Sequence, residues 1–251
     1  MTEVGKKYPL TEALCEFFFV PQEDWDMTIP GIIYNNIQDK FPIKRQEVGK
    51  GVAFRPNEKG VLEQKLEPIP PRLLFFNQPQ DILMQVSPNV LSVNVFRAVL
   101  KWDVFKSLIK YALNQYVNAA EPEGFDKIGL RYITRFDIND VPANMDKYLR
   151  IYPQIPPEFP KDFEEYELSL RINYREKRDY ILLHSEISEI MEKEKTFSLL
   201  FDINYCMDRR YGIRLSELEE WLDYAHKEVR HLFSKSLTER CKNIFEVGEL
   251  G

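Results

Sequence analysis

Histidine, cysteine and glycine are scarce in this 251-residue chain, which contains three, three and ten of them. The odd number and wide spacing of Cys15, Cys206 and Cys241 favour buried thiols in a reducing cytoplasm over a disulfide framework. His226 and His231 lie five positions apart in a predicted helix, so their side chains point about 140° apart and do not share one metal ion. We therefore expect no metal site.

Long apolar runs are also missing. No stretch of about 18 apolar residues occurs, and the first seven residues contain no apolar segment, so we expect neither a membrane span nor a signal peptide. The net charge is −6 and the pI is about 5.3. This acidic balance gives no general attraction to nucleic acid or to an anionic membrane. A cytoplasmic protein is the expectation.

Motifs of catalysis are absent as well. The sequence contains no Walker A loop, no dinucleotide-binding glycine pattern, no His-Glu-x-x-His, no Cys-x-x-Cys and no Gly-x-Ser-x-Gly. We assign no catalytic residue and no cofactor from the sequence.

Hydrophobic periodicity predicts an α+β fold built from two antiparallel-sheet-plus-helix halves. A period of two from 43 to 96 indicates strands, and a helical period follows at about 103–118, with Asp103 as its cap. Strands are predicted again from 168 to 205, followed by a helix at about 216–241. Five prolines between 141 and 163 indicate a connection. The predicted organisation is 1–140, 141–163 and 164–251.

A weak internal repeat links the halves. The segment 91–96 (Leu-Ser-Val-Asn-Val-Phe) leads into a helix that begins near Trp102, and 201–206 (Phe-Asp-Ile-Asn-Tyr-Cys) leads into one that contains Trp221. A duplicated unit whose two sheets join into one would explain this pattern.

The last predicted helix carries a hydrophobic stripe that includes Leu215, Leu222 and Val229, and Ser216 and Glu219 form a capping box at its start. His226 falls at the shoulder of this stripe. We expect it to be a packed, hydrogen-bonded histidine rather than a catalytic one.

The candidate site centres on the strand predicted for 128–138. Its even positions are mostly apolar, whereas Arg131 and Arg135 project from the opposite, largely charged face. Asn94, Glu12 and Glu16 are the candidate partners. Two interpretations remain open: structural ion pairs with Glu12 or Glu16, or contacts of the arginines with a ligand or a partner protein.

Three groups of residues resemble an uncharacterised bacterial family that is sporadically distributed among genomes. They are the start Tyr8-Pro9-Leu10-x-Glu12-Ala13, the centre Gly129-Leu130-Arg131-Tyr132-Ile133-x-Arg135, and the end Ala225-His226 with Phe233 and Leu237-Thr238. The family's usual asparagine after Ile133 is Thr134 here. The family's sporadic occurrence implies horizontally moved genes of the phage-defence or toxin–antitoxin kind.

Two classes of function follow. The first is a non-enzymatic component of a multi-protein bacterial system, which acts through another protein of the same operon or by sensing a ligand. The alternative is an enzyme or nucleotide-ligand binder with Arg131 and Arg135 in a cleft between the halves. The sequence specifies no oligomeric state.

Overall fold

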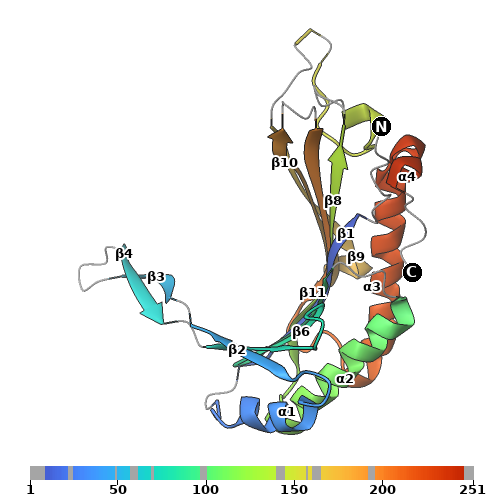
Figure 1. The fold of residues 1–251 in the computed structure, drawn as a ribbon. Helices are drawn as coiled ribbons and strands as arrows, with labels where there is room; N and C mark the ends of the chain where they lie inside the picture. Colours follow the sequence, from blue (N-terminus) through green and yellow to red (C-terminus); the bar gives the residue numbers. More distant parts are fainter. Residues whose placement is uncertain are drawn as a thin grey trace.

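Nine strands form one antiparallel sheet in the order β2-β5-β6-β7-β1-β8-β11-β10-β9 (Figure 1). The computed structural model describes residues 9–245 except 22–24, 49, 57–61, 69–70, 97–100, 140–144, 157, 160–164 and 192–195. The strands are β1 (Leu10–Phe19), β2 (Ile43–Glu47), β5 (Arg72–Phe76), β6 (Ile82–Ser87), β7 (Val90–Phe96), β8 (Phe125–Ile138), β9 (Glu167–Tyr174), β10 (Asp179–Met191) and β11 (Thr196–Asp208). The expected α+β class is confirmed.

The two halves meet inside this sheet. β8 from the first half pairs with β11 from the second over the registers Lys127↔Asp208 to Ile138↔Phe197. Strands from both halves therefore share one continuous ladder of backbone hydrogen bonds. The opening strand β1 lies beside this seam, between β7 and β8.

The strands expected over 43–96 do not all join one sheet. β3 (Lys50–Pro56) and β4 (Leu62–Pro68) leave the main sheet and pair with each other as a separate two-stranded sheet. This hairpin projects away from the helices (Figure 1). β2 then pairs directly with β5, so the sheet continues as if the hairpin were an insertion.

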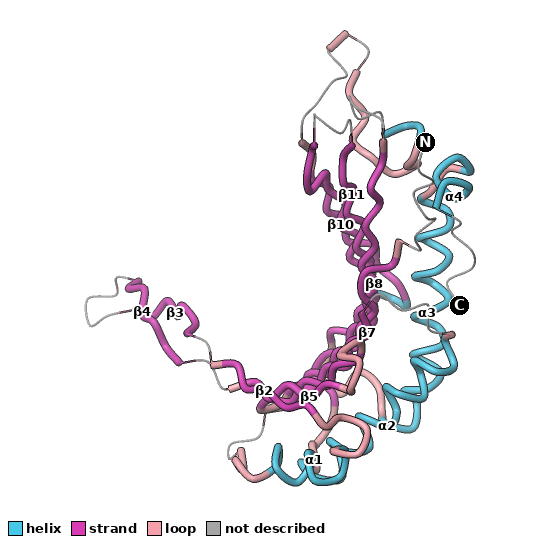
Figure 2. The backbone as a smooth tube through the Cα atoms, in the orientation of Figure 1, coloured by secondary structure: helices cyan, strands magenta, loops and turns pink. Residues whose placement is uncertain are grey.

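Four helices lie along one side of the sheet (Figure 2). They are α1 (Ile29–Ile37), α2 (Trp102–Ala120), α3 (Leu218–Ser236) and α4 (Glu239–Phe245). The sheet bends away from the helices, which line the outer side of the bend, so its other face lies on the inner side (Figure 1). Below, this face is called the open face, and the face under the helices is called the helix face. None of the described helices is long and apolar enough to cross a membrane.

The ends of the predicted helices need correction. Lys101 is the N-cap of α2, and Asp103 lies in its first turn instead of capping it. The start of α3 is preceded by a 3₁₀ turn (Leu215–Glu217) that contains Ser216. The backbone N–H of Arg214 donates to Oε2 of Glu217 at 2.7 Å, so this contact takes the place of the predicted Ser216 box.

The final helix is also broken, because the chain that connects the halves competes for its backbone. Leu237 is extended and forms a β-bridge with Leu149. The N–H of Arg150 donates to the carbonyl of Ser236 at 2.7 Å, and the N–H of Thr238 donates to the carbonyl of Tyr148 at 3.0 Å. Part of the proline-rich 141–163 connection is therefore packed against the second half.

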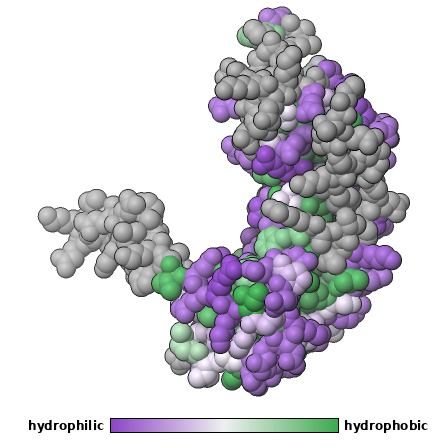
Figure 3. All heavy atoms as spheres, in the orientation of Figure 1, coloured by the Kyte–Doolittle hydropathy of each residue, from purple (hydrophilic) through white to green (hydrophobic). Residues whose placement is uncertain are grey.

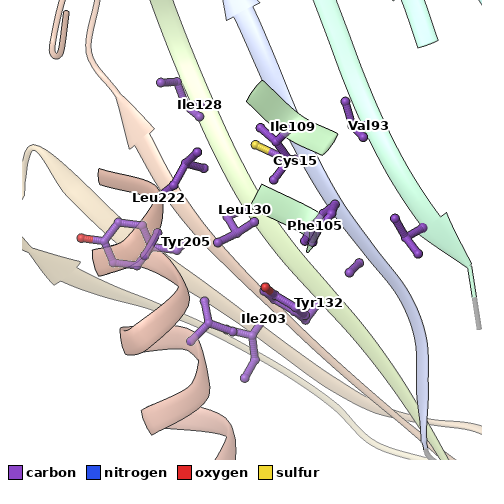
Figure 4. Packing of buried hydrophobic residues seen from close by; sticks show 14 of the residues in the cluster. Cys15, Val93, Phe105, Ile109, Ile128, Leu130, Tyr132, Ile203, Tyr205 and Leu222 are labelled. Carbon is purple, nitrogen blue, oxygen red and sulfur yellow. The ribbon is translucent and has the colours of Figure 1, made fainter. Parts of the chain in front are cut away.

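The core lies between the helix face and α2 and α3. Ile109 of α2 lies beside Cys15 of β1, and α2 also packs on β7, whereas α3, which carries Leu222, packs on β8 and β11 (Figure 4). The stripe predicted on α3 is confirmed at Leu222 and Val229, which are fully buried, but Leu215 is 49% exposed because it precedes the helix. On the face that Figure 3 shows, hydrophilic side chains are more frequent than hydrophobic ones among the described residues.

Candidate functional site

The candidate site lies at the centre of the open face, where four neighbouring strands place side chains in one row. Cross-strand register sets Asn94 of β7 opposite Leu14 of β1, Leu14 opposite Arg131 of β8, and Arg131 opposite Asn204 of β11. Residues two apart on a strand share a face, so Glu12 and Glu16 flank this row. Four of the five predicted site residues therefore gather in one region.

Arg131 pairs with Asp202, a residue that sequence reasoning did not select. Its Nε lies 2.9 and 3.0 Å from the two carboxylate oxygens, and its Nη2 lies 2.5 Å from Oδ2. The Asp202 side chain is 10% exposed and that of Arg131 is 38% exposed. An ion pair of Arg131 with Glu12 or Glu16, one of the two open interpretations, is not formed: β11 adjoins β8 and brings the Asp202 carboxylate diagonally within reach of the guanidinium.

Glu12 is held from the other side of β1. Nδ2 of Asn94 donates to its carboxylate at 2.6 Å. The amide oxygen of Asn94 accepts from Ser92 at 2.8 Å and from Gln85 at 3.0 Å. Asn94 is therefore fixed by side chains from three strands, and it holds the Glu12 carboxylate in place.

Glu16 has no hydrogen-bond or ion-pair partner among the described residues, although it is half-buried. Burial raises the pKa of its carboxyl group, and the nearby charges of Arg131, Lys127 and Arg72 oppose that rise. A half-buried carboxylate with cations near it and no direct donor is able to accept hydrogen bonds from another molecule.

Two further polar groups beside Glu16 have spare capacity. Nε and Nη2 of Arg131 donate hydrogen bonds to Asp202. Within the described part of the chain, Nη1 of Arg131 has no acceptor. Oδ1 of Asn204 is buried and lacks a hydrogen-bond partner. This atom lies over Gly129, where an added Cβ would come within 3.0 Å of it.

Arg135 lies apart from this group. It is four residues along β8 from Arg131, which corresponds to about 13 Å. Its Nε donates to Asp137 at 3.0 Å and its Nη2 donates to Ser198 at 2.8 Å. The two arginines share the open face, as predicted, but they occupy different surroundings.

Asp202 and Asn204 belong to the segment that the sequence repeat had singled out. Asn94 and Asn204 were matched as equivalents, and the structure places both on the open face. Asp202 could have been found from the same segment, because it lies two residues from Asn204 and therefore shares its face.

The three cysteines and His226, the residues most often used as nucleophile or base, are buried. Burial raises the pKa of Cys206 to about 11 and that of Cys241 to about 12, and it raises the pKa of Cys15 as well. His226 is buried and accepts or donates a hydrogen bond with the Tyr132 hydroxyl at 2.8 Å, as a packed histidine was expected to do. Burial lowers its pKa to about 4, so it is neutral at physiological pH.

The site combines donors and acceptors with little net charge. Arg131 offsets Asp202, while Lys127 and Arg72 stand near Glu16. Such a patch suits a partner that carries both donors and acceptors more than it suits a polyanion. Within the ranges that the structure describes, no three His, Cys, Asp or Glu side chains are grouped so that they could hold a metal ion.

No model of a protein family matches this chain, and a search of curated proteins finds no relative of it.

Proposed function

We propose that this protein is a non-enzymatic component of a multi-protein bacterial system of the phage-defence or toxin–antitoxin kind. It acts in the cytoplasm by binding another protein of the same operon. The binding surface is the central cluster of the open face, defined as Glu12, Glu16, Asn94, Arg131, Asp202 and Asn204. The kind of system rests on the family resemblance, and the binding surface rests on the geometry of the cluster.

The observation that carries the proposal is the spare hydrogen-bonding capacity at the centre of the uncovered sheet. Buried and half-buried polar groups are usually paired in folded proteins, because an unpaired group loses its hydration without gaining a partner. Glu16, Nη1 of Arg131 and Oδ1 of Asn204 lack such partners within the described chain. A bound protein segment would supply a donor to Glu16 and an acceptor to Arg131.

The state of the reactive groups supports a binding role. A nucleophilic cysteine requires a lowered pKa and access to substrate, whereas burial raises the pKa of all three thiols. His226 is engaged by Tyr132 and Trp102 in the core between α2 and the sheet. Cys15 and His226 point toward the helix face, and Cys206, which shares the open face with Asn204, is fully buried.

A second candidate is an enzyme or nucleotide-ligand binder that uses Arg131 and Arg135. One observation favours it: Arg131 and Asp202 come from different halves and join across the β8–β11 seam. A ligand there would contact both halves at once.

Co-purification tests the first candidate. The protein is expressed with the products of its neighbouring genes, as wild type, as Glu16→Ala and as Glu220→Ala, an exposed carboxylate of α3 that serves as the control. We expect a neighbouring protein to bind the wild type and the control, and to bind Glu16→Ala at least tenfold more weakly at an unchanged melting temperature. Equal binding by all three would contradict the proposed surface.

Thermal shift assays with ATP and GTP test the second candidate. Stabilisation by a nucleotide that disappears in both Arg131→Lys and Arg135→Lys would favour the ligand-binding function. Melting temperatures that do not respond to nucleotide would favour the first candidate.

A further inference from the structure

The outer edge of β9 carries a second, independent inference. β9 ends the nine-stranded sheet and pairs only with β10, over Glu167↔Glu186 to Tyr174↔Asp179. No other described strand pairs along its outer side. Half of its backbone N–H and C=O groups therefore point away from the sheet and are available for another strand.

Apart from the charged side chains Glu167 and Arg171, β9 lacks the features with which proteins usually protect an edge strand. It is eight residues long, contains no proline, and pairs with β10 in an unbroken register. The opposite edge, β2, is shorter and exposes Lys44, Arg45 and Glu47. Short length and clustered charge discourage strand pairing, so the two edges of one sheet are built differently.

An apolar stripe accompanies this unprotected edge. Leu168, Leu170 and Ile172 share the helix face of β9. They are not fully covered, and Leu170 is 37% exposed. The cause is the position of β9 in the sheet. α3 packs on β8 and β11, whereas β9 is the edge strand and is separated from β11 by β10.

The side chains of β9 are complementary to those of a second β9. Consider two β9 strands, one from each copy, that pair antiparallel with the helices of both copies on the same side of the joined sheet. Each even-numbered residue of one strand then lies opposite an even-numbered residue of the other. A two-fold axis at Ser169 places Glu167 of each copy opposite Arg171 of the other, which gives two such pairs on the open face. It also sets Leu168 opposite Leu170 on the helix face. An axis at Arg171 would instead set two like charges opposite each other, which is unfavourable.

We propose that the protein forms a homodimer by antiparallel pairing of β9 with β9 of a second copy, centred on Ser169. The dimer joins two nine-stranded sheets into one continuous sheet. Cross-strand Glu167–Arg171 pairs select the register, and the Leu168–Leu170 contacts bury the apolar stripe.

Cysteine cross-linking tests the register. The three natural cysteines are buried, so a new surface cysteine is the reporter. Ser169→Cys should form a disulfide-linked dimer under mild oxidation, since residues at the axis directly oppose each other. Asn173→Cys is the matched control on the same strand and face, because the two copies of residue 173 lie about 27 Å apart in this arrangement. Cross-linking at 173 but not at 169, or at neither position, would overturn the proposal.

Charge exchange tests the interface in the otherwise natural protein. Sedimentation velocity over a concentration series should show that Glu167→Lys and Arg171→Glu each weaken dimerisation at least tenfold. The double exchange should restore it, because the opposite charges again face each other. Glu220→Lys on α3 should leave dimerisation unchanged.

A monomer at every concentration of the wild-type protein would overturn self-association. A dimer that is indifferent to both single exchanges would place the interface elsewhere and would equally overturn the proposal. Neither result bears on the central cluster of the open face, because no residue of that cluster lies on β9.

Discussion

The imidazole ring of His226 lies flat on the indole ring of Trp102, with their centroids 4.1 Å apart and their planes 2° apart. Trp102 begins α2 of the first half, and His226 belongs to α3 of the second. Nε1 of Trp102 also donates to Asp223 at 2.7 Å, one turn before His226 on α3. This contact joins the helices of the two halves above the sheet seam that joins their strands.

The first prediction concerns acid stability at this contact. Burial, with the nearby charge of Arg230, lowers the folded-state pKa of His226 from 6.5 to about 4. Below pH 6.5 the unfolded chain therefore binds a proton that the folded protein does not, so the free energy of unfolding falls as the pH drops toward 4. The total decrease in the free energy of unfolding from this group amounts to about 3 kcal/mol.

Urea unfolding of the wild type and of His226→Gln, at several pH values between 7.5 and 4, measures this effect. The variant should lose part of the stacking energy at pH 7.5 and should show a shallower decline below pH 6.5. Parallel pH profiles would mean that His226 is not the group responsible. Binding by the central cluster should be unchanged in this variant, because His226 lies on the other side of the sheet.

The second prediction concerns the ion pair of the open face. Arg131→Ala would leave the carboxylate of Asp202 unpaired at 10% exposure, whereas Arg131 itself is partly exposed and screened by solvent. We expect a loss of about 1 to 3 kcal/mol, less than for a fully buried pair. Arg135→Ala should cost less than about 1 kcal/mol, because Arg135 and Asp137 are both exposed.

Double-mutant cycles over Arg131–Asp202 and over Arg135–Asp137 separate the pair energies from other effects of truncation. The first cycle should give the larger coupling energy. Equal couplings would argue that exposure does not control the strength of these pairs.

The third prediction concerns α3. Leu222 is fully buried against β8 and β11, so Leu222→Ala should lower the free energy of unfolding by about 2 to 5 kcal/mol. Leu215→Ala is the matched control, because the same truncation is made at a residue that is 49% exposed, and it should cost less than about 1 kcal/mol. Similar losses in chemical denaturation would contradict the packing of α3.

The fourth prediction concerns Asp179, a fully buried carboxylate at the turn between β9 and β10. Arg178 donates to it at 2.7 and 2.8 Å, and the Tyr205 hydroxyl donates at 3.1 Å. Asp179→Ala should destabilise the protein by about 3 to 5 kcal/mol, since it leaves a partly buried guanidinium without its partner.

Asp126→Ala is the control for Asp179. Its pair with Arg210 is exposed on both sides and should contribute less than about 1 kcal/mol. Thermal unfolding of both variants makes the comparison, and a loss no larger for Asp179→Ala than for Asp126→Ala would argue against a structural role for the buried carboxylate.

The sequence by itself determined the class of the fold and much of its inner face. Alternation along 128–138 identified the buried side of β8, and helical periodicity identified Leu222 and Val229 as core residues. Both patterns are local, because a strand or helix half-covered by a core repeats its apolar residues with its own period. The packed state of His226 followed from its place beside that stripe.

The tertiary structure alone decided which side chains meet. Glu12 and Glu16 lie on the strand next to Arg131, yet Asp202, 71 residues away in sequence, takes its guanidinium, because the order of strands places β11 on the other side of β8. The break at Leu237 has a similar cause, since the connecting segment supplies backbone partners that no local pattern shows. Strand order and chain crossings depend on contacts far apart in the sequence, and periodicity carries no information about them.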